Sequence, residues 1–263
     1  MKKKTRWPIY LIIGLIITFI AFTVPLPYYI EVPGTSEDIR KVLQVNNQPD
    51  QEEGSYQFVT VGVKHARLVD LVYAWLTPFT DIRSAKEMTG GSSDAEFMRI
   101  NQFYMETSQN MAKYQGLKAA GKEIELKYLG VYVLTVTDNS TFKGILNIAD
   151  TVTAVNDKTF ESSKEMVDYV NSQTLGDKVK VTYQEDGKVK TAEGKIITLE
   201  NGKNGIGIGL IDRTEVSSDV PIKFSTAGIG GPSAGMMFSL SIYTQIADPT
   251  LRNGRIIAGT GSI

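Results

Sequence analysis

One glycine-rich stretch of the chain carries residue types that could do covalent chemistry. It reads Gly-Ile-Gly-Gly-Pro-Ser-Ala-Gly over residues 228–235 and leads into an apolar run, residues 236–246. Glycines let a backbone approach a substrate closely, with its N–H groups facing outward. Ser233 follows a proline that suits the first turn of a helix, so its hydroxyl would lie at the positive end of that helix. On these eight residues alone the favoured interpretation is a glycine-rich turn into a core helix with Ser233 as an ordinary cap, and a serine nucleophile is the alternative.

This octapeptide resembles the catalytic-serine signature of Lon-type serine proteases, in which a Gly-Pro-Ser-Ala-Gly core carries the nucleophile. Residues 220–226 resemble the strand that enters this loop in the family. Residues 255–263 resemble the Thr-Gly strand that follows the serine helix. The resemblance implies that Ser233 is the catalytic nucleophile. The other residues of the expected oxyanion and substrate loop are Gly230, Gly231, Pro232 and Ala234.

The general base is the point at which the sequence departs from the family. In Lon-type proteases the serine works with a lysine well beyond it, but no lysine follows Ser233 here. The resemblance therefore implies that the chain is truncated after Ile263 and that the base lies further on. Lys223, on the expected entering strand, is the alternative base, against a solvated strand lysine. No phosphate-binding Walker A pattern occurs, so we expect proteolysis without an ATPase module.

Other catalytic classes are disfavoured by residue types that are rare or missing. His65 is the single histidine, and a Ser-His-Asp triad would have to use it with a carboxylate such as Asp70. Nothing near His65 has triad context, so we expect a structural or surface histidine. A trypsin-like PDZ protease is disfavoured because its Gly-Asp-Ser-Gly-type loop is not visible. With no cysteine and one histidine we expect no metal site, and we expect no cofactor.

The N-terminus combines a basic cluster with an uncharged segment. Lysines at positions 2 to 4 and Arg6 precede a stretch without charge, residues 7–30, which has aromatic residues at both ends. Such a stretch can span a bilayer core of about 30 Å. A cleavable signal peptide is the alternative, although no small-residue cleavage site follows. We expect a single-pass anchor over residues 8–29, with residues 1–7 in the cytoplasm and the bulk of the chain outside the cell.

Residues 123–195 have the pattern of a small β-rich domain. A strand is expected over residues 126–136, another over 150–157, and a helix over 162–173. This order resembles a bacterial PDZ domain, in which backbone N–H groups hold a peptide carboxylate and a strand pairs with the peptide. The residues that the resemblance assigns to peptide binding are Leu129, Gly130, Val131, Met166, Val167 and Val170. A β-rich domain without peptide binding is the alternative.

Together these features predict an α+β chain in which a discontinuous, incomplete Lon-type protease domain carries an inserted PDZ-like domain. Residues 30–122, including a long helix from Ser93 or Asp94, form its first part, and residues 205–263 form the catalytic core. We expect a membrane-anchored serine endopeptidase of a Gram-positive-like cell that cleaves peptide or protein substrates guided by the PDZ domain. A non-catalytic anchored PDZ peptide-binding protein is the alternative. The net charge of −1 argues against nucleic-acid binding, and the oligomeric state stays open.

Overall fold

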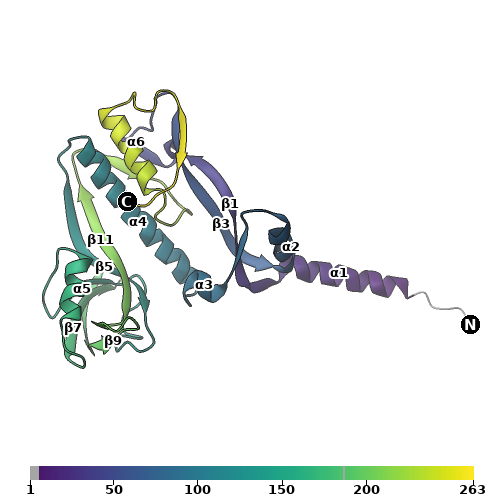
Figure 1. Cartoon of the computed structure of the whole chain (residues 1–263), viewed down its shortest axis with the longest axis horizontal. Coiled ribbons are helices and arrows are strands. Elements are labelled where there is room, and N and C mark those ends of the chain that lie inside the picture. The colour runs from purple at the N-terminus through teal and green to yellow at the C-terminus, as the bar shows by residue number, and fades with distance from the viewer. Residues whose placement is uncertain (1–5, 186) are drawn as a thin grey trace, which may run out of the picture. The chain divides into compact units, whose positions relative to one another are not determined.

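The chain divides into two compact units, and each is described by itself. The computed structural model describes residues 6–185 and 187–263, whose helices and strands are shown in Figure 1. Unit 1 comprises Met1–Ser36 and Thr60–Ser93, and unit 2 comprises Glu37–Val59 and Asp94–Ile263. The strands β1 (Pro25–Asp38) and β3 (Ser55–Arg67) contribute residues to both units. The lysines at positions 2 to 4 lie outside the described residues.

Unit 1 begins with the apolar helix α1 (Trp7–Thr23), none of whose residues is buried. The helix is shorter than the expected span of residues 8–29. Strand β1 starts at Pro25, and Pro25 and Pro27 cannot continue a helix because they lack an N–H donor. Within the part of the chain that the structure describes, no helix is both long and apolar enough to cross a membrane.

The rest of unit 1 consists of short elements around β1 and β3. They are α2 (Leu68–Leu76), β4 (Asp81–Ser84) and α3 (Ala85–Thr89). Strand β1 pairs antiparallel with β4, with Tyr29 opposite Arg83. The ring of His65 lies 4.3 Å from that of Tyr29, centroid to centroid. Asp70 accepts hydrogen bonds from Lys64 Nζ at 2.8 Å and Arg67 N at 2.9 Å, so this carboxylate caps the start of α2.

Unit 2 contains a two-helix layer and a five-stranded sheet. The elements of the helical layer are η1 (Ile39–Lys41), β2 (Leu43–Val45), α4 (Asp94–Ala119), β12 (Ile222–Phe224), α6 (Gly235–Ala247) and β13 (Ile256–Gly259). The elements of the sheet region are β5 (Glu125–Val136), β6 (Thr151–Val155), α5 (Ser163–Asn171), β7 (Lys178–Glu185), β8 (Lys188–Lys195), β9 (Ile197–Thr198), β10 (Asn204–Gly205) and β11 (Ile208–Ser217).

Helices α4 and α6 pack closely against each other and share a core with β2, β3 and β12. A Cβ added at Gly116 on α4 would lie 2.8 Å from the Ile242 side chain, so glycine allows the close approach of the two helices. The loop after α6 is fixed by Arg252, whose fully buried guanidinium pairs with Asp50 and donates to the Glu53 carbonyl. A buried cation paired in this way serves the fold, because leaving its partner alone would be costly.

The sheet has the order β11-β5-β6-β7-β8 and is antiparallel throughout. Its apolar side packs on α5, with Met166, Val170 and Ile206 in the same buried cluster. Strand β11 pairs with β5 along its full length, from Ile208 opposite Val136 to Ser217 opposite Glu125. The sequence pattern ended the β-rich domain at residue 195 and placed residues from 205 onward in the catalytic core. In the structure, that later segment contributes the first strand of the sheet.

Candidate functional site

Ser233 lies in an exposed turn just before α6. Its side chain is exposed, whereas the next two residues, Ala234 and Gly235, are buried. Helix α6 begins at Gly235 with Ala234 as its N-cap, so the serine precedes the helix rather than lying in its first turn, as the sequence suggested. The positive end of the α6 dipole still lies close to this position and favours negative charge.

Helix α4 holds the serine loop at two points. Ser108 Oγ donates to the Pro232 carbonyl at 2.9 Å, and the Gly231 amide donates to the Asn101 carbonyl at 2.8 Å. A Cβ at Gly230 would lie 2.8 Å from Asn101 Cβ, and one at Gly235 would lie 2.6 Å from Ser108 Oγ. These glycines therefore let the loop lie directly on α4. The Gly231 amide is engaged in this contact, which removes it from the expected set of oxyanion donors.

The segment after β13 flanks the serine on its other side. The Gly261 amide donates to the Ser233 carbonyl at 2.7 Å, and the Met236 amide donates to the Gly261 carbonyl at 3.0 Å. These two hydrogen bonds join Ser233 and Met236 to Gly261, in the segment after β13. The serine backbone is thus held from two directions while its hydroxyl stays accessible, as a nucleophile requires.

Three basic side chains of unit 2 bear on the choice of a general base: Lys223, Lys113 and Arg252. Lys223 lies on β12 opposite Gln44 with an exposed side chain. Burial lowers the pKa of Lys113 on α4, with Glu106 opposing the shift, and its ammonium lies 5.6 Å from the Phe224 ring. Arg252 is committed to its ion pair with Asp50. The Phe224 ring therefore accounts for the partly buried position of the Lys113 ammonium.

The residues expected to form the carboxylate-binding loop lie inside strand β5. Val131 is fully buried and is paired on both sides, with Asp212 of β11 and Val152 of β6. Gly130 has φ +131°, and an added Cβ would lie 2.2 Å from the Val152 carbonyl oxygen. Gly130 is paired with Arg213 inside β5, and the register with β11 shifts at Leu129, so these residues lie in a bulged strand rather than in an open loop. The expected pairing strand, residues 132–136, faces β11 instead of a free edge.

The outer edge of this sheet beside α5 belongs to β11, and α4 covers part of it, since Thr107 and Asn110 donate to the carbonyls of Asp212 and Thr214. Among the described strands β11 pairs with β5 alone, and α5 packs against both β10 and β11. Of the expected helix residues, Met166 and Val170 are buried in the domain core and Val167 is half-buried. Two contacts fix α5 to this edge: Ser163 N donates to Asp212 Oδ1 at 3.3 Å, and Asn204 Nδ2 donates to the Gln173 carbonyl at 2.8 Å.

A glycine-rich loop leads into β11 and orients two amides. Its sequence is Gly-Ile-Gly-Ile-Gly over residues 205–209, and Gly207 has φ +73°. The Ile206 carbonyl accepts from Ser140 Oγ at 2.5 Å, and the Gly207 carbonyl accepts from Thr137 N at 2.8 Å. In a trans peptide the C=O and the following N–H point in opposite directions. The amides of Gly207 and Ile208 therefore point away from β5 and its following turn, where a peptide carboxylate could accept both.

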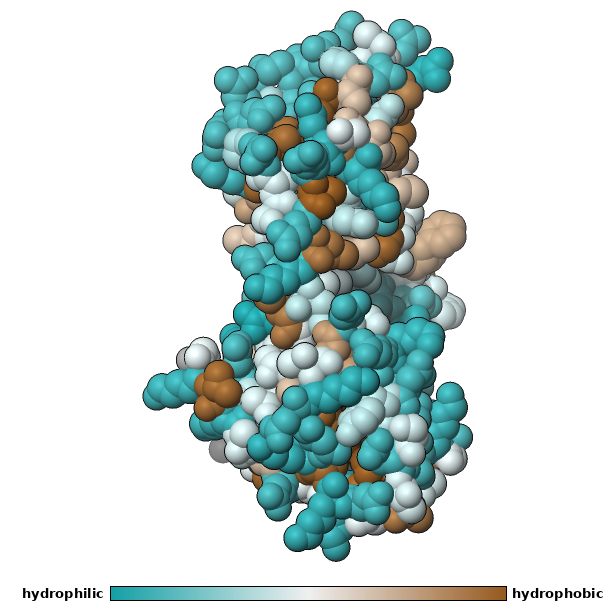
Figure 2. All heavy atoms as spheres, turned by 90° about the vertical axis from the view of Figure 1, so that its left-hand side faces the viewer, coloured by the Kyte–Doolittle hydropathy of each residue, from teal (hydrophilic) through white to brown (hydrophobic). Residues whose placement is uncertain are grey.

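Sequence reasoning passed over this loop although its signal was present. Alternating glycine and isoleucine leaves a strand without large side chains on one face, which is typical of close backbone approach to another chain. The surface around the sheet is mostly polar: on the face shown in Figure 2, apolar residues form small patches among hydrophilic ones. An apolar, backbone-lined edge is thus a distinctive feature of this region.

Comparison with known proteins identifies one domain family within the chain. The family model described as PDZ domain matches residues 102–196, from within α4 to just past the end of β8. A solved PDZ domain of an SdrC-like protein from Listeria monocytogenes is 35% identical, with a TM-score of 0.32, and the match covers 33% of this chain and 93% of that one.

Two further solved structures are similar over the same share of the chain. The PDZ domain of an SdrC-like protein from Listeria innocua is 38% identical, with a TM-score of 0.30 over 31% of this chain and 92% of that one. The second domain of a Listeria protein is 39% identical, with a TM-score of 0.30 over 33% of this chain and 87% of that one. The search of curated proteins gives no match. The match to the family model shows that residues 102–196 contain a PDZ domain, a module that typically binds peptides.

Proposed function

We propose that this chain belongs to a serine endopeptidase that resembles Lon-type proteases and uses its PDZ domain to guide substrates. The observation that carries the proposal is Ser233, an exposed serine held before a helix start by α4 at Asn101 and Ser108. A site with fixed backbone dipoles stabilises the negative charge that develops when a hydroxyl attacks a peptide carbonyl.

The proposed reaction follows acyl transfer. Ser233 Oγ attacks the carbonyl carbon and its proton passes to a neutral amine, and the leaving amine takes that proton as the peptide bond breaks. Water then hydrolyses the serine ester and restores the hydroxyl. The base is proposed to be a lysine beyond residue 263, kept neutral by burial in an apolar site.

The test compares three proteins on a flexible, unstructured peptide substrate. They are the 263-residue chain, a chain extended through the expected lysine, and the extended chain carrying Ser233→Ala. Mass spectrometry should find cleavage only with the second. Cleavage that survives Ser233→Ala would end the serine-protease proposal, and cleavage by the 263-residue chain that depends on Lys223 would move the base to β12.

We propose further that α1 anchors the protein to a membrane with the bulk of the chain outside the cell. Its 17 residues carry no charge and none of them is packed in a core. At 1.5 Å per residue the helix is roughly 25 Å long, so the adjoining uncharged residues would have to complete the crossing. Protease added to intact protoplasts should digest residues after Tyr29 and leave the N-terminus protected. Protection of the C-terminal part would contradict this topology.

The second candidate is a non-catalytic, anchored peptide-binding protein. It is favoured by a difference between the two loops. The Gly231 amide is engaged by Asn101, whereas the amides of Gly207 and Ile208 point away from β5 and could hold a carboxylate. This candidate predicts that the extended chain binds peptides ending in an apolar residue but cleaves none of them. The three-protein comparison therefore separates the two functions.

A further inference from the structure

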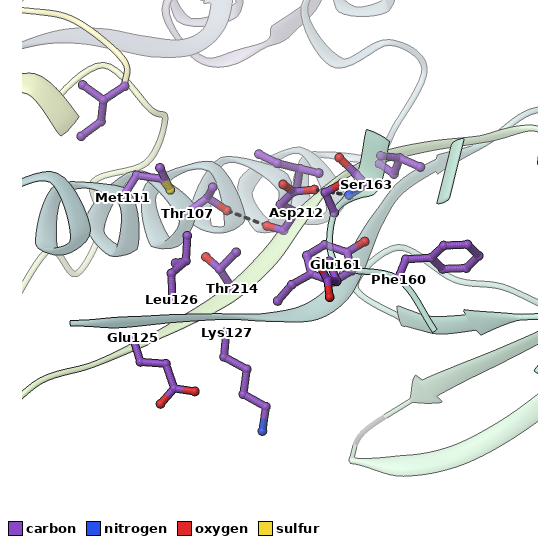
Figure 3. A pocket seen from close by; sticks show the side chains of 15 residues that line it. Thr107, Met111, Glu125, Leu126, Lys127, Phe160, Glu161, Ser163, Asp212 and Thr214 are labelled. Carbon is purple, nitrogen blue, oxygen red and sulfur yellow. Dashed lines mark hydrogen bonds between the residues drawn. The ribbon is translucent and has the colours of Figure 1, made fainter. Parts of the chain in front are cut away.

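A pocket of about 900 Å³ lies where the PDZ sheet meets α4. We call it the junction pocket. It lies next to the N-terminal end of α5 and beneath the side chains of α4 that face the sheet (Figure 3). The residues that line it are Thr107, Met111, Glu125, Leu126, Lys127, Tyr128, Phe160, Glu161, Ser162, Ser163, Leu210, Ile211, Asp212, Thr214 and Ile263.

One side of the junction pocket continues the open edge of β11. Leu210, Asp212 and Thr214 of this strand belong to the pocket lining. A peptide that pairs with β11 and places its carboxylate at the amides of Gly207 and Ile208 runs antiparallel to the strand. Pairing can extend to Ile211, because Thr107 and Asn110 already donate to the Asp212 and Thr214 carbonyls. The earlier residues of the peptide then leave the strand edge and enter the junction pocket.

The opposite side of the junction pocket is built from residues that touch the serine loop. Ile263 lines the pocket, and its Cγ1 would lie 3.0 Å from a Cβ built at Gly235, two residues after Ser233. Thr107 also lines the pocket and donates to the Asp212 carbonyl, while the next residue, Ser108, holds the Pro232 carbonyl. The pocket lining and the contacts that hold the serine turn thus share Ile263 and neighbouring residues of α4.

The lining of the junction pocket suits an extended peptide. Within the described residues the hydroxyl groups of Tyr128 and Thr214 are buried without a hydrogen-bond partner. Burial raises the pKa of Tyr128, so its hydroxyl keeps the proton and can donate to a peptide carbonyl. Figure 3 shows Leu126 and Thr214 pointing into the space under α4. Unpaired hydroxyls can bond to the backbone of an extended peptide, and the neighbouring apolar side chains can contact its side chains.

We propose that the junction pocket carries a substrate from the PDZ edge to Ser233, so that the enzyme cleaves at a fixed distance from a free C-terminus. The proposal rests on the proposed function and names its substrate class: unstructured C-terminal tails that end in an apolar residue. From Ile208 to Ile211 the strand advances by three residues, roughly 10 Å at 3.3 Å each, and the junction pocket holds the residues that precede them in the peptide. Cleavage is therefore expected on the order of ten residues before the C-terminus.

The test measures binding rather than turnover, so it stands even if no cleavage occurs. Fluorescence anisotropy is recorded for a five-residue and a twelve-residue peptide with the same apolar C-terminus, using the full chain. The longer peptide should bind about tenfold more tightly. Met111→Glu, in the pocket, should remove that gain and leave the short peptide unaffected. Met98→Glu, on an exposed part of the same helix and outside the pocket lining, is the matched control and should change neither affinity.

A second measurement uses the unmodified chain, in case Met111→Glu disturbs folding. A photo-crosslinking residue placed about ten positions before the peptide C-terminus should label the junction pocket residues or the serine loop. The same residue placed near the C-terminus should label β11 or α5. Equal affinity of the two peptides, or labelling of the pocket from neither position, would overturn the proposal. Binding of both kinds without cleavage would refute the peptidase and leave the path intact.

Discussion

Two glycine-rich stretches of unit 2 look alike in sequence and have different structural roles. In residues 228–235, Gly230 and Gly235 are needed because α4 lies directly against the loop. In residues 205–209, Gly207 has φ +73° and turns two amides away from the sheet. The first stretch brings a side chain into position, and the second exposes backbone. Glycine spacing alone does not separate these roles, because both depend on which element lies behind the glycine.

The strongest way to test the first role is to remove the hydroxyl of Ser233, the proposed nucleophile. Ser233→Ala in the extended chain should lower kcat at least about 10³-fold, because the remaining groups of the unit cannot replace it. Ser225→Ala, at an exposed serine just before the loop, should leave kcat unchanged. Peptide binding measured by anisotropy should survive in both variants. A parallel loss of binding in Ser233→Ala would mean that the serine belongs to the binding site rather than to the chemistry.

The next largest effect concerns a glycine that the sequence assigned to peptide binding. Gly130→Ala should lower the free energy of unfolding by about 3–4 kcal/mol, because the new Cβ meets the Val152 carbonyl and the backbone angle disfavours alanine. Gly144 also has a positive φ, +76°, but open space around it, so Gly144→Ala should cost only about 1 kcal/mol. Chemical denaturation measures both. Lost peptide affinity in a fully stable Gly130→Ala protein would instead restore the original assignment.

Gly130 shows what the sequence could and could not predict. The strand expected over residues 126–136 is observed as Glu125–Val136, and the long helix from Asp94 is observed to Ala119. Both follow from local periodicity, which a sequence displays directly. The pairing of β5 with β11 joins segments that are far apart in the chain, and no local pattern encodes that partner. The sequence pattern therefore placed Gly130 in a binding loop, whereas in the structure it lies inside a paired strand.

The serine turn was easier to place from the sequence than the edge of β11, and its catalytic role stays a prediction. Ser233 lies in a contiguous motif, so its type and neighbours were readable together. Its supports were not: Asn101 and Ser108 come from a helix more than a hundred residues earlier. The junction pocket likewise combines residues from α4, β5, β11 and the segment before α5. Sites of this kind require the fold, since their residues meet only in three dimensions.

A third prediction tests the backbone role of residues 205–209. Ile208→Pro removes an amide that points away from β5, and proline is tolerated on an open strand edge. The protein should keep its thermal stability and lose about tenfold or more of its affinity for peptides with a free C-terminus, because a hydrogen bond to a charged acceptor is lost. Amidating the peptide should weaken binding to the unmodified chain and make little difference to the variant. Equal binding of free and amidated peptides by the unmodified chain would contradict carboxylate recognition.

The smallest expected effect distinguishes the two ends of the proposed peptide path. Tyr128→Phe removes a buried hydroxyl that has no partner among the described residues, and losing an unpaired polar group is neutral or slightly stabilising, by up to about 1 kcal/mol. If the hydroxyl serves a peptide in the junction pocket, the same change should weaken binding of a twelve-residue peptide by about threefold, while a five-residue peptide is unaffected. A thermal melt and the two anisotropy titrations measure these quantities independently. A structural hydroxyl would lower stability and leave both affinities alone, so a variant that is equally stable and binds only the long peptide less tightly would place the substrate next to Tyr128.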